Sequence, residues 1–375
     1  MTATTTTESE QQQSPAAAAK HAKPSSLWQD LGALGSLLAY GLRNPWEMYT
    51  GAGPTLNELT CGLAGSSFKP KRDIGDLAGK VIFVTGGNTG IGKETILQLA
   101  HHRPHRIYLA ARTESKARDA IASIKAAVSS PVDIRYIPLD LASFASIKNA
   151  ASQFTSECER LDILILNAGI MGHPPQTTEA GHEIQFGTNH VGHFLLTKLL
   201  LPTLLRTAST NADADVRVIT VASIASGVAS SFSFDELTST PGLLAASTWQ
   251  RYGASKAANI LFASELARRH PELLSVSVHP GVVKSDLYET TKARNAFARY
   301  VLDLTAPLAM RTVSSGALNQ LWAAAGASRE QLASANGAFY TPVGNVHPRN
   351  RFVADAEMAR RLWEWTEGEV SRALA

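Results

Sequence analysis

A tyrosine and a lysine stand four positions apart in the stretch "RYGASKAAN" at residues 251–259, where a helical pattern begins. Residues at this spacing share one face of a helix, so the ammonium of Lys256 can lie close to the phenol of Tyr252. A nearby cation stabilises a phenolate and lowers the phenol pKa from its usual value of about 10. The pair could therefore exchange a proton with a bound molecule, although the same spacing also arises by chance on ordinary helix surfaces.

Two further polar residues follow or interrupt apolar segments. Ser223 comes directly after the run "VITVA", where a parallel strand delivers residues to its carboxyl edge, but an ordinary turn serine would look the same. Asn189 lies in "TNHVGHF", within a mostly apolar helical pattern. Because asparagine is a poor helix former, Asn189 indicates a positional role, and a buried amide with satisfied hydrogen bonds would give the same pattern.

A glycine-rich turn, "TGGNTGIGKET", follows the apolar run "KVIFVT" and precedes a helical pattern. The order strand, glycine-rich turn, helix is the context of a dinucleotide-binding loop, in which the pyrophosphate lies at the helix N-terminus. A tight turn without a ligand is the alternative. The predicted cofactor contacts in this loop are Gly86, Asn88, Thr89, Gly90, Ile91 and Gly92.

The end of the second strand predicts which cofactor is bound. Arg112 stands twenty positions after Gly92 (112 − 92 = 20), in "LAART", where NAD-binding chains usually present an acid to the ribose hydroxyls. An arginine attracts the 2′-phosphate of NADP, which an acid would repel. The sequence therefore favours NADP over NAD, unless Arg112 is only a solvated loop residue.

From Asp76 onward, short β-branched runs alternate with longer helical segments, and most of the runs are apolar throughout. This pattern predicts an α/β fold with a doubly wound, mostly parallel, seven-stranded Rossmann-type sheet and helices on both faces. The expected strands are 80–85, 106–110, 133–138, 161–166, 216–221, 274–279 and 337–342. The expected helices lie near 91–102, 114–128, 143–158, 180–205, 252–270 and 313–325.

The chain divides by composition. Leucines at helical spacing in 27–42 predict an amphipathic helix, too short to span a bilayer, that packs on the protein itself or lies in a membrane interface. The expected regions are a disordered low-complexity tail at 1–26, an N-terminal extension at 27–75, a Rossmann-type domain at 76–350 and a C-terminal helix at 351–375.

The bulk composition excludes some classes of function. A chain of 375 residues with a net charge of +3 and no basic run is not expected to bind nucleic acid. Cys61 and Cys158 provide neither a disulfide framework nor a paired metal-ligand spacing. We therefore expect no bound metal, and we expect the protein to reside in a reducing compartment. We therefore expect a cytoplasmic protein. Peripheral membrane contact through 27–42 and homodimer formation both stay open.

The motifs TGGNTGIG, LNAG, TNHVGHF, ITVASIASG, YGASK and HPGVVKSDL occur in this order between about Leu77 and Gly344. This set resembles the short-chain dehydrogenase/reductase family and, within it, the retinol-dehydrogenase-like branch, to which "GALNQLWAAAG" and "NGAFYTPVG" are also similar. The resemblance implies a catalytic tetrad of Asn189, Ser223, Tyr252 and Lys256. In that tetrad Tyr252 carries the proton, Lys256 tunes it and bonds the nicotinamide ribose, Ser223 polarises the substrate oxygen, and Asn189 holds a water.

The same resemblance implies further cofactor contacts. Asp140, with Leu141 beside it, matches an adenine-contacting acid, and Ser285 stands where the family more often has threonine. The full set of these further contacts is Asp140, Leu141, Asn167, Ala168, Gly169, Tyr252, Lys256, Pro280, Val283 and Ser285.

The expected activity is an NADP(H)-dependent interconversion of a ketone or aldehyde and its alcohol on a bulky, largely apolar small molecule. A polyketide, terpenoid, steroid or retinoid-like substrate, as in secondary metabolism, fits the apolar helical face of Phe297, Tyr300, Val301 and Leu304, which could be a lid, core or dimer contact. Two alternatives stay open: reduction of a carbon–carbon double bond by the same tyrosine and lysine, or a non-catalytic NADP-binding scaffold or sensor.

Overall fold

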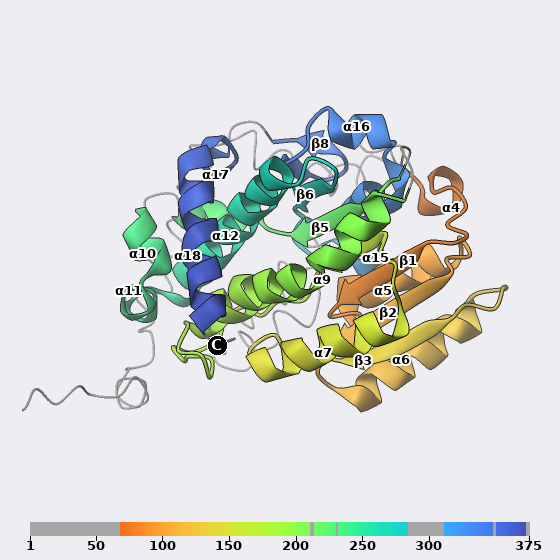
Figure 1. The fold of residues 1–375 in the computed structure, drawn as a ribbon, viewed down its shortest axis with the longest axis horizontal. Helices are drawn as coiled ribbons and strands as arrows, with labels where there is room; N and C mark the ends of the chain where they lie inside the picture. The colour runs from red at the N-terminus through yellow and green to blue at the C-terminus, as the bar shows by residue number, and fades with distance from the viewer. Residues whose placement is uncertain (1–67, 211–213, 230–231, 284–310, 348–349, 373–375) are drawn as a thin grey trace, which may run out of the picture.

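The computed structural model describes residues 68–210, 214–229, 232–283, 311–347 and 350–372 (Figure 1). The predictions for the low-complexity tail, for the amphipathic helix at 27–42, for Ser285 and for the helical face around Tyr300 lie outside the described residues.

The described residues form one eight-stranded sheet with the order β3-β2-β1-β4-β5-β6-β7-β8. Strands β1 to β7 pair in parallel, and β8 pairs antiparallel with β7. The strands are β1 Val81–Thr85, β2 Arg106–Ala111, β3 Ile134–Pro138, β4 Ile163–Leu166, β5 Arg217–Val221, β6 Leu274–Val278, β7 Phe339–Thr341 and β8 Asn345–Val346. The predicted doubly wound, mostly parallel Rossmann-type sheet is thus confirmed.

The sheet has one strand more than predicted. Strand β8 has two exposed residues and follows β7 after a short turn that ends at Gly344, which has φ 71°. Two exposed residues carry no periodic hydrophobic signal, so a pattern search cannot find such a strand.

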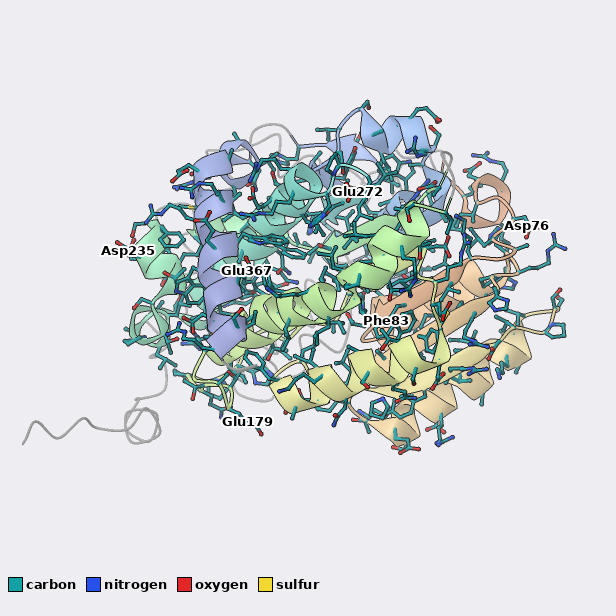
Figure 2. The ribbon with its side chains drawn as sticks, in the orientation of Figure 1. Asp76, Phe83, Glu179, Asp235, Glu272 and Glu367 are labelled. Atoms are coloured by element: carbon teal, nitrogen blue, oxygen red, sulfur yellow. The ribbon has the colours of Figure 1, made fainter. Side chains whose placement is uncertain are left out.

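Apolar cores lie on both faces of the sheet because successive strand residues point to opposite faces. Phe83 of β1 belongs to the core beneath α7, α9, α12 and α18, whereas its neighbour Ile82 belongs to the core beneath α5, α6 and α15. Figure 2 shows Phe83 within the outline of the molecule, with the labelled carboxylates Asp76 and Asp235 at its right and left edges. Strands buried on both faces explain the continuous apolar runs of the sequence.

The helices agree with most of the predicted segments. The long ones are α5 Gly90–Ala100, α6 Glu114–Ala127, α7 Phe144–Glu157, α9 Gly192–Ala208, α12 Thr248–Arg269, α15 Val313–Leu321 and α18 Ala356–Arg372. The short ones are α4 Pro70–Asp73, α8 Ile184–Phe186, α10 Phe234–Thr238, α11 Thr240–Ala245, α16 Arg329–Ala333 and α17 Arg351–Ala354, with a 3₁₀ helix η2 Ile224–Ala229 and π-helices η1 Gly187–Val191 and η4 Trp322–Gly326.

Helix α12 begins at a fixed point because its N-terminus carries a capping box. The Ser247 side chain accepts from the Gln250 backbone N–H, and the Gln250 side chain accepts from the Ser247 N–H. The cap places Tyr252 and Lys256 in the first half of the helix, one turn apart.

The C-terminal helix α18 runs across α12 (Figure 1). Trp363 of α18 stacks on Phe262 of α12 with ring centroids 5.8 Å apart and meets Phe194 of α9 edge-on at 4.9 Å. The described part of 351–375 forms two helices, α17 and α18, in place of the one expected, and α18 shares the core beneath α9 and α12. Among the described residues, we find no helix with the length and apolar character needed to cross a bilayer.

Candidate active site

The carboxyl ends of four neighbouring strands form one edge of the sheet. Since β1, β4, β5 and β6 are adjacent in that order, Gly86, Asn167, Ser223 and Pro280 follow them along the same edge. Ligands of open parallel sheets bind at this edge, beside the point where the strand order reverses. Here the reversal lies between β1 and β4.

The glycine-rich turn after β1 closes tightly on itself. Gly86 and Gly90 have φ of 67° and 52°, which favour glycine, and a Cβ on Gly92 would stand 2.3 Å from the Gly86 carbonyl oxygen. The Asn167 amide donates to the Thr85 carbonyl at 2.9 Å and to the Gly86 carbonyl at 3.3 Å. The loop after β4 thus fixes the turn from beneath.

This turn fits a dinucleotide pyrophosphate. The Thr89 side chain, at the N-cap of α5, makes no capping hydrogen bond within the described residues, and the first turn of α5 contains no acidic residue. The first N–H groups of a helix have no partner within the helix, so those beginning at Gly90 and Ile91 can donate to an anion. Asn88 lies half-buried in the same turn.

The predicted adenine end lies where β2 and β3 finish. Arg112 is exposed directly after β2, and half-buried Asp140 follows the neighbouring β3, where its carboxylate accepts from the Ala142 N–H at 2.9 Å. The carbonyl oxygen of buried Leu141 stands 2.2 Å from an ideal Cβ on Gly192, so a larger residue could not begin α9 there. The loop carrying Asp140 is thereby packed against α9.

Three members of the predicted tetrad surround the loop after β4. Lys256 Nζ lies 5.7 Å from the Tyr252 ring centroid and donates to the Val221 carbonyl at 2.8 Å. An ideal Cβ on Gly169 would stand 3.3 Å from Asn189 Oδ1 and 3.6 Å from Lys256 Nζ. Gly169 therefore leaves room for both Asn189 and Lys256 beside it, and Ala168 donates its N–H to Thr85 Oγ1 at 3.0 Å.

Asn189 is held by a π-helix and by hydrogen bonds to two other segments. It lies in η1, between α8 and α9, and is fully buried. Its Oδ1 accepts from the Ile170 N–H at 2.8 Å, while its Nδ2 donates to the Ile170 carbonyl at 3.0 Å and to Ser255 Oγ at 2.9 Å. The amide thus links the loop after β4 to α12, which combines the positional role and the satisfied amide expected from the sequence.

Ser223 lies at the end of β5, beside the helix that carries the tyrosine. Its Oγ accepts from the Ala225 N–H at 3.1 Å, and an ideal Cβ on Gly253 would stand 2.6 Å from the Ala225 carbonyl oxygen. Glycine next to Tyr252 thus lets η2 approach α12 closely. Met171, Ala225 and Tyr252 form a small apolar cluster with Trp249 against it, so the phenol has apolar neighbours.

Burial controls the electrostatics of the site. It lowers the pKa of the Lys256 ammonium to about 7, because the charged form loses its hydration. It also lowers the pKa of His193, whose imidazole lies between Thr85 Oγ1 and the Asn189 carbonyl at 2.9 Å from each, to about 4. A neutral His193 therefore connects the end of β1 with the π-helix at neutral pH.

The predicted nicotinamide segment follows β6. Half-buried Pro280 precedes Gly281, which has φ 89°, and buried Val283 forms an isolated bridge with Arg311. Arg311 donates its backbone N–H to the Val282 carbonyl at 2.7 Å. Ser285 is the predicted contact outside the described residues.

Sequence reasoning missed a buried ion pair next to the tyrosine. Arg251 Nε lies 3.1 Å from Glu183 Oε1, and both side chains are at most 1% exposed. Arg251 also donates to the carbonyls of Ala246 and His173, at 2.9 and 2.7 Å. The available signal was the position of an arginine immediately before Tyr252 in α12.

A groove with a volume of about 650 Å³ lies between α9, α12 and α18, and no predicted site residue lines it. Within the described residues there is also no cluster of histidine, cysteine and carboxylate side chains suited to hold a metal ion.

Comparison with known proteins identifies relatives of this chain. The short chain dehydrogenase family model matches residues 80–233. A short-chain dehydrogenase/reductase of Armillaria gallica is 38% identical, over 82% of this chain and 97% of its own. Human retinol dehydrogenase 13 is also 38% identical, over 76% and 83%.

Solved structures give the same result. The Pseudomonas aeruginosa RhlG/NADP active-site complex is similar with a TM-score of 0.55 and 25% identity, over 72% of this chain and 96% of that one. Sheet topology and relatives agree that the chain belongs to the short-chain dehydrogenase/reductase family, in its retinol-dehydrogenase-like branch, whose enzymes are oxidoreductases using NAD(P).

Proposed function

We propose that the chain is an NADP(H)-dependent oxidoreductase that interconverts a ketone or aldehyde and its alcohol, with Tyr252 as the acid and base. The observation that carries this proposal is the burial of Tyr252 and Lys256 one turn apart on α12, with Lys256 against Gly169 and Tyr252 in one cluster with Ala225, whose N–H bonds Ser223. A scaffold or sensor would not require a buried lysine held next to a phenol.

The nicotinamide would supply or accept the hydride. In the reduction, Tyr252 donates its phenolic proton to the substrate oxygen, and the Lys256 ammonium stabilises the phenolate that remains. Ser223 donates a hydrogen bond to the same oxygen while negative charge develops there. In the oxidation each proton moves the other way, and Tyr252 accepts the proton of the alcohol.

Asn189 holds Tyr252 and Lys256 in position through its hydrogen bonds. Its amide is bonded to the Ile170 backbone and to Ser255, which lies between Tyr252 and Lys256 on α12. We propose that this bonding fixes Lys256 against Gly169, and that the buried Asn189 region also holds the water through which a proton returns to Tyr252.

The preference for NADP is proposed from Arg112, whose exposed guanidinium follows β2 without an acid in the usual position. The occurrence of NADP in the similar RhlG complex supports it. An apolar substrate is proposed from Met171, Ala225 and Trp249 around Tyr252. The likeness to human retinol dehydrogenase 13 supports a bulky lipid-like alcohol or carbonyl compound.

The test is product identification with the purified full chain, NADPH and a broad library of ketones, aldehydes and enones. We expect an alcohol product from a bulky apolar ketone or aldehyde, and we expect Tyr252→Phe to abolish turnover while NADPH binding stays nearly intact. Near wild-type activity in Tyr252→Phe would exclude the proposed acid. If the product is an enone with its carbon–carbon double bond reduced, double-bond reduction replaces carbonyl reduction as the proposed reaction. If no compound is converted, a non-catalytic scaffold is favoured.

A further inference from the structure

The segment "GALNQLWAAAG" contains two amides that the proposed chemistry does not use. Asn319 and Gln320 are neighbours on α15, and they are 0% and 1% exposed. A buried amide without hydrogen bonds costs free energy, so the partners of these two side chains show what the helix positions.

Asn319 bonds the carboxyl ends of the last two parallel strands. Its Nδ2 donates to the His279 carbonyl at 2.8 Å and to the Tyr340 carbonyl at 2.9 Å, while its Oδ1 accepts from the Gly344 N–H at 3.0 Å. His279 directly precedes Pro280, so Asn319 fixes the start of the segment predicted to meet the nicotinamide.

Gln320 bonds the opposite end of the cofactor site. Its Nε2 donates to Thr95 Oγ1 of α5 and, at 3.4 Å, to Asn167 Oδ1. Thr95 in turn donates to the Ile91 carbonyl at 2.8 Å, and Asn167 Nδ2 bonds the Thr85 and Gly86 carbonyls of the glycine-rich turn. Gln320 therefore supports both the loop and the helix expected to bind the pyrophosphate.

The backbone of α15 is also held close to the nicotinamide segment. An ideal Cβ on Gly316 would stand 2.5 Å from a methyl of Val283, so only glycine allows this approach. On its other side α15 packs along α5. One short helix thus touches both halves of the predicted cofactor site.

We propose that Asn319 and Gln320 are positioning residues for the dinucleotide, with Asn319 serving the nicotinamide half and Gln320 serving the pyrophosphate half. The inference rests on the proposed cofactor site, though not on the substrate or on turnover. Two amides that merely filled the core would affect both halves of the cofactor alike.

The experiment compares two ligands by titration calorimetry with the full chain. NADP⁺ contains both halves, whereas 2′-phospho-ADP-ribose contains the pyrophosphate but no nicotinamide. The variants are Asn319→Leu and Gln320→Met, which keep side-chain volume. Gln98→Met is the matched control, because Gln98 lies on α5 and its amide bonds Glu94 of the same helix.

We expect Gln320→Met to weaken both ligands by a similar factor of about ten, as expected for a lost buried hydrogen-bond pair. Asn319→Leu should weaken NADP⁺ by about the same factor and leave 2′-phospho-ADP-ribose within about twofold. Gln98→Met should bind both ligands like the wild type.

The inference would be overturned if Asn319→Leu weakened the binding of both ligands equally. It would also be overturned if neither Asn319→Leu nor Gln320→Met changed the affinity for either ligand. If a variant does not fold, Asn319→Asp or Gln320→Glu is measured in the same way, since each keeps an acceptor and loses the donors. Binding of NADP⁺ without turnover of any carbonyl compound would refute the proposed function and leave this test intact. If the wild type binds only NAD⁺, the comparison uses NAD⁺ and ADP-ribose.

Discussion

At the scale of single residues, Lys256 is unusual because a buried lysine must hold its charge without water. Burial lowers its pKa to about 7, and its Nζ has the Val221 carbonyl as a partner. In the free enzyme, raising the pH through this value therefore removes the cation that stabilises the Tyr252 phenolate.

This titration gives a pH prediction. The kcat/KM for NADPH reports ionisations of the free enzyme, so it should fall above pH 7 by about tenfold per pH unit as Lys256 loses its proton. Lys256→Met should lose turnover and bind NADPH more weakly at every pH. Steady-state kinetics from pH 6 to 9 check this. A break near pH 7 that persisted in residual activity of Lys256→Met would assign the ionisation to another group.

Arg112 gives a prediction for cofactor choice. Arg112→Asp should weaken NADPH by about ten- to a hundredfold and leave NADH nearly unchanged, because a carboxylate repels the 2′-phosphate that the guanidinium attracts. Ratios of kcat/KM for the two cofactors provide the measurement. Arg118→Asp is the control, since Arg118 is exposed on the following helix and pairs with Glu114. A wild type that prefers NADH would contradict the prediction directly.

At the scale of elements, the Glu183–Arg251 pair ties the N-terminus of α8 to the first turn of α12. Glu183 Oε2 accepts from the N–H groups of Gln185 and Phe186 at 2.9 and 2.8 Å, so the same carboxylate caps the helix leading to Asn189. Burial raises the pKa of Glu183 to about 7, and Arg251 opposes this rise. One pair thus supports the helix that leads to Asn189 and the helix that carries Tyr252 and Lys256.

Breaking this pair should destabilise the fold. Arg251→Met should lower the free energy of unfolding by about 3–5 kcal/mol, because it leaves a buried carboxylate unpaired. The loss should be larger at pH 8 than at pH 6, where a proton can replace the arginine on Glu183. Urea unfolding monitored by circular dichroism measures both values.

Two comparisons make the stability prediction specific. The double variant Glu183→Gln/Arg251→Met should regain part of the loss, since no uncompensated charge remains. Arg118→Met, which removes an exposed pair with Glu114, should cost at most about 0.5 kcal/mol. Equal costs for Arg251→Met and Arg118→Met would show that the buried pair is not a tie between the two helices.

The sequence predicts the helices and strands better than it predicts the side-chain contacts that join them. Apolar runs predicted seven strands to within two residues at each end, because burial on both faces determines residue type along the whole run. The residues predicted for the tetrad do gather at one sheet edge. Their supports were not predicted: Glu183 and Arg251 are 68 positions apart, and Gln320 and Thr95 are 225 positions apart. Local periodicity carries no information on such partners.

At the scale of the whole molecule, buried histidines make the stability of the fold depend on pH. Burial is the main cause that lowers the pKa of five histidines among the described residues: His182 and His193 to about 4, His190 and His279 to about 3, and His102 by a smaller amount. Unfolded histidines titrate near 6.5. Between about pH 6.5 and pH 4 the unfolded chain therefore binds more protons than the folded chain.

Acid should therefore destabilise the folded chain. The free energy of unfolding should fall as the pH drops below 6.5, and the stability from these groups is lost progressively down to their folded pKa values. Urea unfolding at pH 7.5, 6.5, 5.5 and 4.5 measures the slope. His190→Gln should reduce the slope by about one proton, while His105→Gln, at an exposed position, should leave it as in the wild type. A flat profile down to pH 4.5 would contradict the prediction.

The same histidines join distant parts of the chain. His190 Nε2 lies 3.1 Å from Thr366 Oγ1 of α18, and His193 bonds Thr85 at the end of β1. His182 packs edge-on against Trp365 of α18 at 5.9 Å. Protonation of these histidines at low pH should therefore destabilise the C-terminal helix α18 and the π-helix η1 together.

The π-helix at Gly187–Val191 also matters for anyone who aligns or redesigns this chain. A π-turn holds one residue more than an α-turn, and each residue of an α-helix advances by about 100°. Deleting one residue there would rotate either the segment before it or all of α9 by that angle. Thr188 or His190 would then point to Ile170 in place of Asn189. Sequence alignments and chimaeras in this region should therefore be anchored on Asn189, and gaps should be kept out of 187–191.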